Sequence, residues 1–210
     1  LDQSLKRMNL DYVDIFYSHR FDPNTPLHET MQALVDIVRS GKALYAGISN
    51  YPHEAAEYAY KYLADHDVPC LLHQVKYNML HRVPETANLL EQAKAAGSGL
   101  IAFSPLAQGV LTDRYLNGIP SDSRAARDFS LKASTITPEL LQKIQKLNAL
   151  AAERGQSLAQ MALAWILSNS LVTSVIVGAS SIGQLDSNLQ SIRNTSFSAE
   201  EIEQINALTI

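Results

Sequence analysis

With 210 residues, of which 46% are hydrophobic and 18% charged, the chain has enough apolar side chains for one sizeable core, which indicates a globular protein. A net charge of -4 with scattered basic residues argues against nucleic-acid binding, and no apolar run reaches the roughly 18 residues of a membrane span. Cys70 is the only cysteine, which excludes an internal disulfide and indicates a reducing, cytoplasmic compartment; we expect it to be a small buried strand residue.

The first residues of the sequence have the pattern of a segment from within a fold. Leu1 is not an initiator methionine, and residues 4–8 look like the last turns of a helix that leads into a strand. We therefore expect that the natural protein has further N-terminal residues, and that any targeting signal would lie among them.

The first complete unit is a strand followed by a helix. Residues 12–17 are aromatic or β-branched apart from one aspartate, as in a buried strand, and they end in Ser-His-Arg. Thr25 is expected to cap the next helix with Pro26 at its first position, and Gly41 is expected to end it.

The same pattern returns along the chain. Residues 44–48, 71–75 and 99–103 are predicted strands, and helices are predicted after the first two of them. The third runs into a polar, irregular stretch, 108–137. Because loops longer than about 12–15 residues are usually functional or disordered, this stretch is a candidate cover for a cofactor or substrate.

Helices dominate the last third of the chain. One is predicted over 138–154, and capping boxes predict two more helix starts, pairing Ser157 with Gln160 and Ser198 with Glu201.

A fifth strand is predicted between these helices, at 172–177, and a further helix follows it. Spacing within that helix predicts that Ile182, Leu185 and Leu189 face the interior.

Five successive strand-helix units with buried strands predict an α/β protein with a parallel sheet and helices outside it. A doubly wound sheet would usually carry G-x-G-x-x-G after a strand, and the sequence has no such trio. We therefore predict a partial (β/α)8 TIM barrel, with strands 4 to 8 present and strands 1 to 3 absent, and residues 1–210 forming a single partial domain. Three missing units of about 30 residues each would complete a barrel of ordinary size.

Polar motifs stand at the ends of the predicted strands, where a barrel places its chemistry. In order and spacing, residues 12–20, 47–50, 73–78, 103–109 and 177–180 resemble those of the aldo-keto reductases. Within that family the chain is most similar to bacterial glyceraldehyde-3-phosphate/methylglyoxal reductases and potassium-channel β subunits. The resemblance implies NADP(H) as cofactor and the reduction of small aldehydes or ketones to alcohols. Whether the protein is a monomer or a homo-oligomer is left open.

The resemblance places His19 where the family has its active-site histidine. A fixed N–H donor there would stabilise the negative charge that develops on a carbonyl oxygen as hydride arrives. The family's other catalytic groups, an Asp, a Tyr that supplies the proton and a Lys, belong to earlier strands, so His19 alone is assigned as catalytic. We expect the 210 residues by themselves to be inactive.

The resemblance assigns Ser49, Asn50 and Gln74 to the nicotinamide carboxamide, which needs hydrogen-bonding partners in its plane. Helix capping is the alternative role for Ser49 and Asn50. Phe103 is expected beneath the nicotinamide ring, where relatives often have Tyr or Trp.

The resemblance assigns a third set of residues to the phosphates and the adenosine of the cofactor. The glycines of this set would let the backbone approach the phosphates, and its arginines would bind them by charge. Its members are Ser104, Pro105, Leu106, Gln108, Gly109, Arg114, Arg124, Gly178, Ser180, Gln184 and Asn188. Ser180 is expected near a helix N-terminus that favours phosphate. Arg114 replaces a frequent Lys, and Ser187 replaces an acidic residue.

Two other functions stay open. An NADP(H)-binding regulatory subunit of the channel type would be favoured by Asn in place of His19. A metal-dependent barrel hydrolase would need metal ligands, and the histidines here lack ligand spacing, so no metal is expected.

Overall fold

The computed structural model spans residues 1–210 and describes all of them except 122, 124 and 128–130. Backbone contacts divide the chain into two compact units. Unit 1 comprises Leu1–Lys76, Val83–Ile101 and Leu171–Thr173; unit 2 comprises Tyr77–Arg82, Ala102–Ser170 and Ser174–Ile210.

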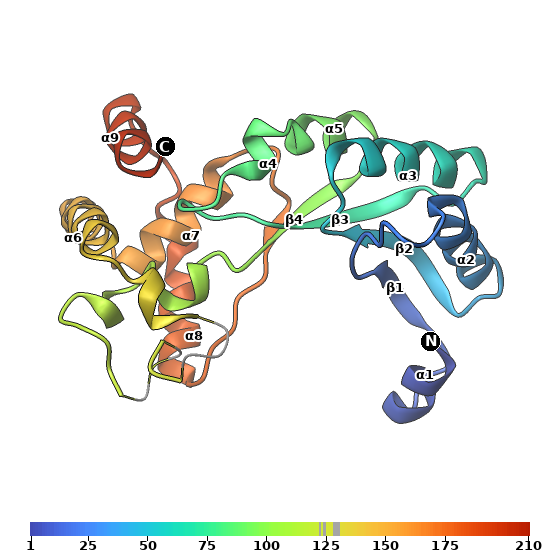
Figure 1. Ribbon diagram of the computed structural model, residues 1–210, viewed down its shortest axis with the longest axis horizontal. Helices are drawn as coiled ribbons and strands as arrows, with labels where there is room; N and C mark the ends of the chain where they lie inside the picture. The colour runs from blue at the N-terminus through green and yellow to red at the C-terminus, as the bar shows by residue number, and fades with distance from the viewer. Residues whose placement is uncertain (122, 124, 128–130) are drawn as a thin grey trace. The chain divides into compact units, whose positions relative to one another are not determined.

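The strands follow one another in the sheet in the same order as in the sequence, β1-β2-β3-β4-β5 (Figure 1). They are β1 (Val13–Ser18), β2 (Ala43–Ser49), β3 (Cys70–Lys76), β4 (Gly99–Phe103) and β5 (Ser174–Val175). The pairs β1–β2 and β2–β3 are parallel. This sequential order confirms the predicted α/β class and is that of a partial (β/α)8 barrel.

Unit 1 also contains helices. These are α1 (Asp2–Met8), α2 (Leu27–Arg39), α3 (His53–Asp65), α4 (Val83–Thr86) and α5 (Leu89–Ala95). α2 packs on β1 and β2, α3 packs on β3, and both helices lie on the same side of the strands in Figure 1. The predicted inner face of α3 is confirmed, since Ala56, Ala59, Tyr60 and Leu63 are all buried.

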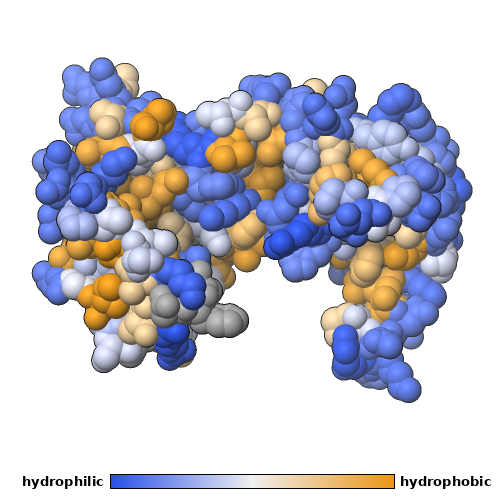
Figure 2. Space-filling model, in the orientation of Figure 1, coloured by the Kyte–Doolittle hydropathy of each residue, from blue (hydrophilic) through white to orange (hydrophobic). Residues whose placement is uncertain are grey.

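Burial on both faces, which was predicted for the strands, is wrong for parts of unit 1. Tyr12, Leu44 and Tyr45 are 49%, 50% and 46% exposed. Figure 2 shows apolar surface along the stretch that joins α1 to β1. The reason is that the described helices of unit 1 cover one side of β1 and β2.

On β1 and β2 a tyrosine ring occupies the space next to a glycine. Tyr17 is paired with Gly47 in the parallel register, and a Cβ on Gly47 would lie 2.7 Å from Cε1 and 2.8 Å from Cδ1 of that ring. The missing side chain of Gly47 is therefore what makes room for Tyr17.

The start of α2 differs from the prediction by one residue. Pro26 is the N-cap and makes no side-chain cap. The Thr25 hydroxyl instead donates to Asp22 at 2.7 Å, so it is not available to the helix. The predicted end is confirmed, because Gly41, which follows the C-cap Ser40, has φ of 73°.

Unit 2 is mainly helical. Its α-helices are α6 (Pro138–Glu153), α7 (Leu158–Ser168), α8 (Ile182–Leu189) and α9 (Ala199–Thr209). Both capping boxes are confirmed, with Ser157 paired to Gln160 at the start of α7 and Ser198 to Glu201 at the start of α9. None of the helices in the described part of the chain is long and apolar enough to span a membrane.

Short 3-10 helices break up the stretch that was predicted to be irregular, and one more follows α8. They are η1 (Ala107–Gly109), η2 (Asp113–Tyr115), η3 (Ala133–Thr135) and η4 (Gln190–Arg193). Leu111 and Tyr115 anchor the stretch, since they are 0% and 1% exposed.

Two predictions near the C-terminal end are wrong. The fifth strand is shorter than predicted, at Ser174–Val175. Ile182, Leu185 and Leu189 do not face inward; they are 80%, 44% and 54% exposed. The face of α8 that carries the buried Asn188 is the inner one, and α8 packs against α7, which leaves the apolar stripe uncovered by the described residues of unit 2.

Candidate functional site

Unit 2 contains a cavity of about 1030 Å³ directly after the ends of β4 and β5. This volume reaches the upper end of ordinary small-ligand cavities, roughly 300–1000 Å³, so an extended ligand such as a dinucleotide would fit. The cavity gathers most of the residues that the sequence assigned to phosphate and adenosine. They are Ser104, Pro105, Leu106, Gln108, Gly109, Arg114, Gly178, Ser180, Gln184 and Asn188. Arg124, from the same set, lies outside the described residues.

The backbone at the start of this cavity is held in an uncommon conformation. Ser104, Ala107 and Gln108 have φ of 53°, 47° and 61°, and Gly109 has φ of 99°. Side-chain contacts hold the run in place, since Asn78 Nδ2 donates to the Ser104 carbonyl at 2.9 Å. Left-handed non-glycine residues cost free energy and gather at ligand sites, so this run supports a binding role for the loop.

Ser180 has its donors engaged within the cavity wall. Its N–H and its hydroxyl both donate to Gln184 Oε1 at 2.9 Å. The N-cap of α8 is Ser181, whose Oγ accepts from the Gln184 N–H at 3.2 Å. A phosphate that used Ser180, as the sequence predicts, would therefore have to replace the Gln184 carbonyl.

Charged side chains in the cavity wall are Asp113, Arg114 and Arg127. The sequence analysis missed Arg127, together with Thr112 and Ser157, which also line the cavity. No motif marks Arg127 or Thr112, and the capping box marks Ser157 only as the start of a helix. The signal for Arg127 and Thr112 was that both lie in the stretch 108–137, already a candidate cover.

Unit 1 places the remaining predicted residues at the ends of its strands. Ser49 pairs with Gln74 in the β2–β3 register, and the Asn50 N–H donates to the Gln74 carbonyl at 3.0 Å. Asn50 Nδ2 donates to Ser49 Oγ at 3.1 Å. The alternative role of capping α3 is not seen, because the N-cap is Pro52 without a side-chain cap.

The side chains of Gln74 and His19 in unit 1 have polar groups without a partner in the described part of the chain. The Gln74 carboxamide is half-buried and makes no hydrogen bond to another described residue. His19, directly after β1, is exposed and likewise has no hydrogen bond within the described part of the chain. A carboxamide and an imidazole that pair with none of the described residues are available to a ligand.

Tyr51 is a residue of this region that the sequence analysis missed. It is 2% exposed, its hydroxyl oxygen lies 2.7 Å from Ser18 Oγ, and its ring meets Phe21 edge-on with centroids 5.7 Å apart. Tyr51 therefore fixes the chain on both sides of His19. Burial raises the pKa of its hydroxyl, so it acts as a neutral hydrogen-bonding group.

Phe103 ends β4 in unit 2 and is half-buried, and its carbonyl accepts a hydrogen bond from the Tyr77 N–H at 3.3 Å. It does not contribute to the wall of the cavity in that unit. Its expected place beneath a nicotinamide ring stays a prediction.

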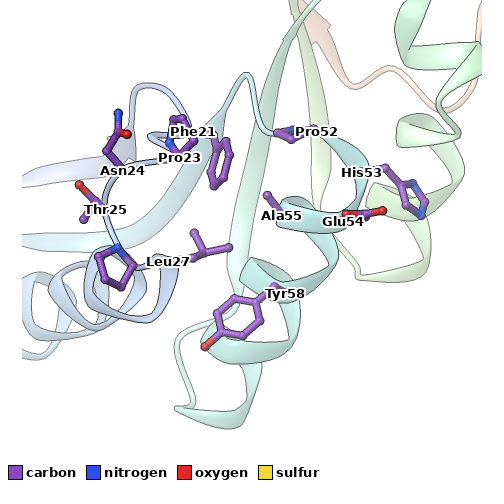
Figure 3. A pocket seen from close by; sticks show the side chains of 11 residues that line it. Phe21, Pro23, Asn24, Thr25, Leu27, Pro52, His53, Glu54, Ala55 and Tyr58 are labelled. Carbon is purple, nitrogen blue, oxygen red and sulfur yellow. The ribbon is translucent and has the colours of Figure 1, made fainter.

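Unit 1 has a second hollow, of about 740 Å³, which contains none of the predicted site residues. Figure 3 shows Phe21, Leu27, Ala55 and Tyr58 around the space between the start of α2 and the start of α3. Its wall combines apolar side chains with His53 and Glu54, and no strand-end motif of the sequence analysis falls on it. Among the described residues, no group of three or more His, Cys, Asp or Glu side chains could hold a metal ion.

Sequential parallel strands, helices between them and a cavity at the strand ends define a partial (β/α) barrel with a ligand site. Residues 1–210 match the Aldo/keto reductase family, so the chain belongs to that family.

Curated relatives agree with this assignment. The chain is 51% identical to the L-glyceraldehyde 3-phosphate reductase of Escherichia coli O157:H7, over 98% of the chain and 60% of the relative. It is 38% identical to the probable voltage-gated potassium channel subunit beta of Oryza sativa subsp. japonica, over 90% of the chain and 59% of the relative. The chain thus spans about 60% of the length of the reductase.

A solved structure has the same fold. The crystal structure of the thermostable aldo-keto reductase Tm1743, in complex with the inhibitor epalrestat, superposes with a TM-score of 0.75 at 28% identity. The match covers 99% of this chain and 64% of that chain.

Proposed function

We propose that this chain carries the NADP(H)-binding part of an NADPH-dependent reductase for small aldehydes or ketones. The observation that carries the proposal is the cavity of unit 2, which gathers ten of the residues assigned to phosphate and adenosine. The similarity to an L-glyceraldehyde 3-phosphate reductase supports glyceraldehyde 3-phosphate or methylglyoxal as the kind of substrate.

The residues present suit a dinucleotide. Gly109 with φ of 99° and Gly178 present bare backbone to the cavity, and Arg114 and Arg127 supply positive charge for phosphates. In unit 1, the free carboxamide of Gln74 and the Ser49 hydroxyl can pair with the carboxamide of a nicotinamide.

The bound cofactor would supply the hydride that reduces the carbonyl. His19 would donate a hydrogen bond to the carbonyl oxygen as negative charge develops there. Tyr51 would keep His19 in place through Ser18 and Phe21. The proton would come from the tyrosine that the family resemblance assigns to an earlier strand.

We further propose that both units belong to one barrel domain, that the protein works in the cytoplasm, and that it assembles as a homo-oligomer. The free, buried Cys70 agrees with a reducing compartment. Light scattering on the purified protein tests the oligomer.

The test of the reductase uses the protein at its full natural length and follows NADPH consumption with methylglyoxal and with glyceraldehyde 3-phosphate. The matched variant is His19→Asn. We expect kcat to fall by about tenfold to a hundredfold, because one hydrogen bond to a developing charge is lost, with little change in the Kd for NADPH. An enzyme that binds no NADPH, or a variant that keeps full turnover, would contradict the proposal.

A second candidate is a cofactor-binding regulatory subunit, which the likeness to potassium channel β subunits favours. It predicts tight NADPH binding without substrate turnover, so the same assay separates the two. His19 at the end of β1 supports the reductase.

A further inference from the structure

We propose that Arg127, which neither the family resemblance nor the motifs single out, binds a phosphate group of the dinucleotide in the cavity of unit 2. This inference rests on the proposed function, and it adds a specificity-determining residue to the site.

Arg127 is placed where it can reach a ligand in the cavity. Its side chain lines the cavity together with Arg114. The side chains of Arg82 and Arg154 donate hydrogen bonds to other residues, whereas the Arg127 side chain makes no hydrogen bond or ion pair within the described part of the chain. Asp113 is the acidic residue among those described in the wall, and it does not pair with Arg127.

Two hydrogen bonds to Ser123 hold the backbone at Ala126 and Arg127. Ser123 is 1% exposed, its Oγ accepts the Ala126 N–H at 3.1 Å and its carbonyl accepts the Arg127 N–H at 3.3 Å. Ala125, between them, is 0% exposed. The turn at the buried Ser123 thus positions the backbone at Arg127, while the guanidinium pairs with no residue that the structure describes.

The charge and the hydrogen-bond donors of Arg127 suit a phosphate group. The described wall holds two guanidinium groups against one carboxylate, and the Ser180 donors are already engaged by Gln184. A guanidinium keeps its charge at all working pH values and offers a planar set of donors that matches phosphate oxygens. The Arg127 guanidinium, which has no partner among the described side chains, is therefore suited to the cofactor diphosphate or to the 2′-phosphate of NADP(H).

The test measures Kd for NADPH and for NADH by calorimetry, with the protein at its full natural length, first at low salt and then at a higher salt concentration. The variants are Arg127→Ala and Arg127→Lys, and Arg193→Ala is the control, because Arg193 is exposed in the same unit and does not line the cavity. We expect Arg127→Ala to weaken NADPH binding about tenfold or more and to reduce its salt dependence. Lysine should restore part of the loss, and the control should stay within roughly twofold.

The two cofactors identify the phosphate. A loss confined to NADPH assigns Arg127 to the 2′-phosphate, whereas an equal loss for both cofactors assigns it to the diphosphate. If Arg127→Ala binds NADPH as tightly as Arg193→Ala does, the inference is wrong while the proposed function stands. If the unaltered protein binds neither cofactor, both fail.

Discussion

His73 is a titratable side chain enclosed in the interior of unit 1. It is 0% exposed, and its Nδ1 lies 2.8 Å from the Tyr60 hydroxyl oxygen, while its Nε2 has no partner among the described residues. Burial lowers the pKa of His73 from 6.5 to about 4 and raises that of the neighbouring Cys70 thiol to about 11. Both groups are therefore uncharged in the folded protein near neutral pH.

This buried imidazole predicts acid sensitivity. Between pH 6.5 and about pH 4 the unfolded chain takes up a proton on His73 that the folded chain does not, so the free energy of unfolding falls over that window. At about 1.4 kcal/mol per pKa unit, the loss below that window is on the order of 3 kcal/mol. Urea denaturation from pH 8 to pH 4 measures it.

The comparison variant is His73→Asn, whose side-chain oxygen can still meet the Tyr60 hydroxyl but does not titrate. Its unfolding free energy should change less between pH 6.5 and pH 4 than that of the unaltered protein. Equal pH profiles for the two proteins would show that His73 does not cause the loss.

Single residues were predicted well where their role depends on the local chain. Cys70 is buried in a strand, and Gly41 ends α2 with positive φ, both as expected. Thr25 was assigned the wrong partner, because the choice between a helix N–H and the Asp22 carboxylate depends on a turn whose geometry the sequence does not display. Tyr51 was missed because its partner Ser18 is 33 residues away.

At the scale of elements, Gln160 joins α7 to α8. Its Oε1 accepts the Ser157 N–H at 2.9 Å within the capping box, and its Nε2 donates to the Ser187 carbonyl at 3.1 Å. Ser187 and Asn188 line the cavity from α8. One side chain therefore both starts α7 and holds the cavity face of α8.

Two substitutions separate these roles. Gln160→Glu keeps an acceptor for the cap but removes the donor to Ser187, and Gln160→Ala removes both. We expect Glu to weaken NADPH binding with little loss of stability, and Ala to cost about 1 kcal/mol of stability as well. Calorimetric Kd values and urea unfolding curves measure the two effects, and unchanged NADPH binding in both variants would show that the α7–α8 link does not shape the site.

Helices and strands were predicted best where the residue types and the hydrophobic periodicity indicate the same element. Four strands and both capping boxes were found because each has strong local signals. The stripe Ile182, Leu185 and Leu189 was placed inward because spacing identifies an apolar face but does not say what packs against it. β5 was overestimated because apolar residues beside a strand extend its pattern without extending its hydrogen bonds.

At the scale of the whole molecule, we expect a protein that consists of residues 1–210 alone to show no NADPH-dependent reduction of methylglyoxal. The resemblance assigns the proton-donating tyrosine to an earlier strand, and the chain spans about 60% of its reductase relative. NADPH absorbance measures turnover, with the protein at its full natural length as control. Turnover by residues 1–210 would show that the tyrosine of an earlier strand is not needed as the proton donor.

The family and the fold class could be predicted from the sequence because strand-end motifs are short, local and ordered. The cavity also gathers residues that the motifs marked, from Ser104 to Asn188. Arg127 could not be found in the same way, since it reaches the cavity from an irregular stretch whose path depends on the buried Ser123 turn.

The contact between the Tyr17 ring and Gly47 couples the evolution of one position on β1 to one position on β2. Since a methyl group at position 47 would press on that ring, natural variation at either position is restricted by the other. A relative with alanine or a larger residue at position 47 should carry a smaller side chain at position 17. These two sites should therefore co-evolve as a pair, although 30 positions separate them along the chain.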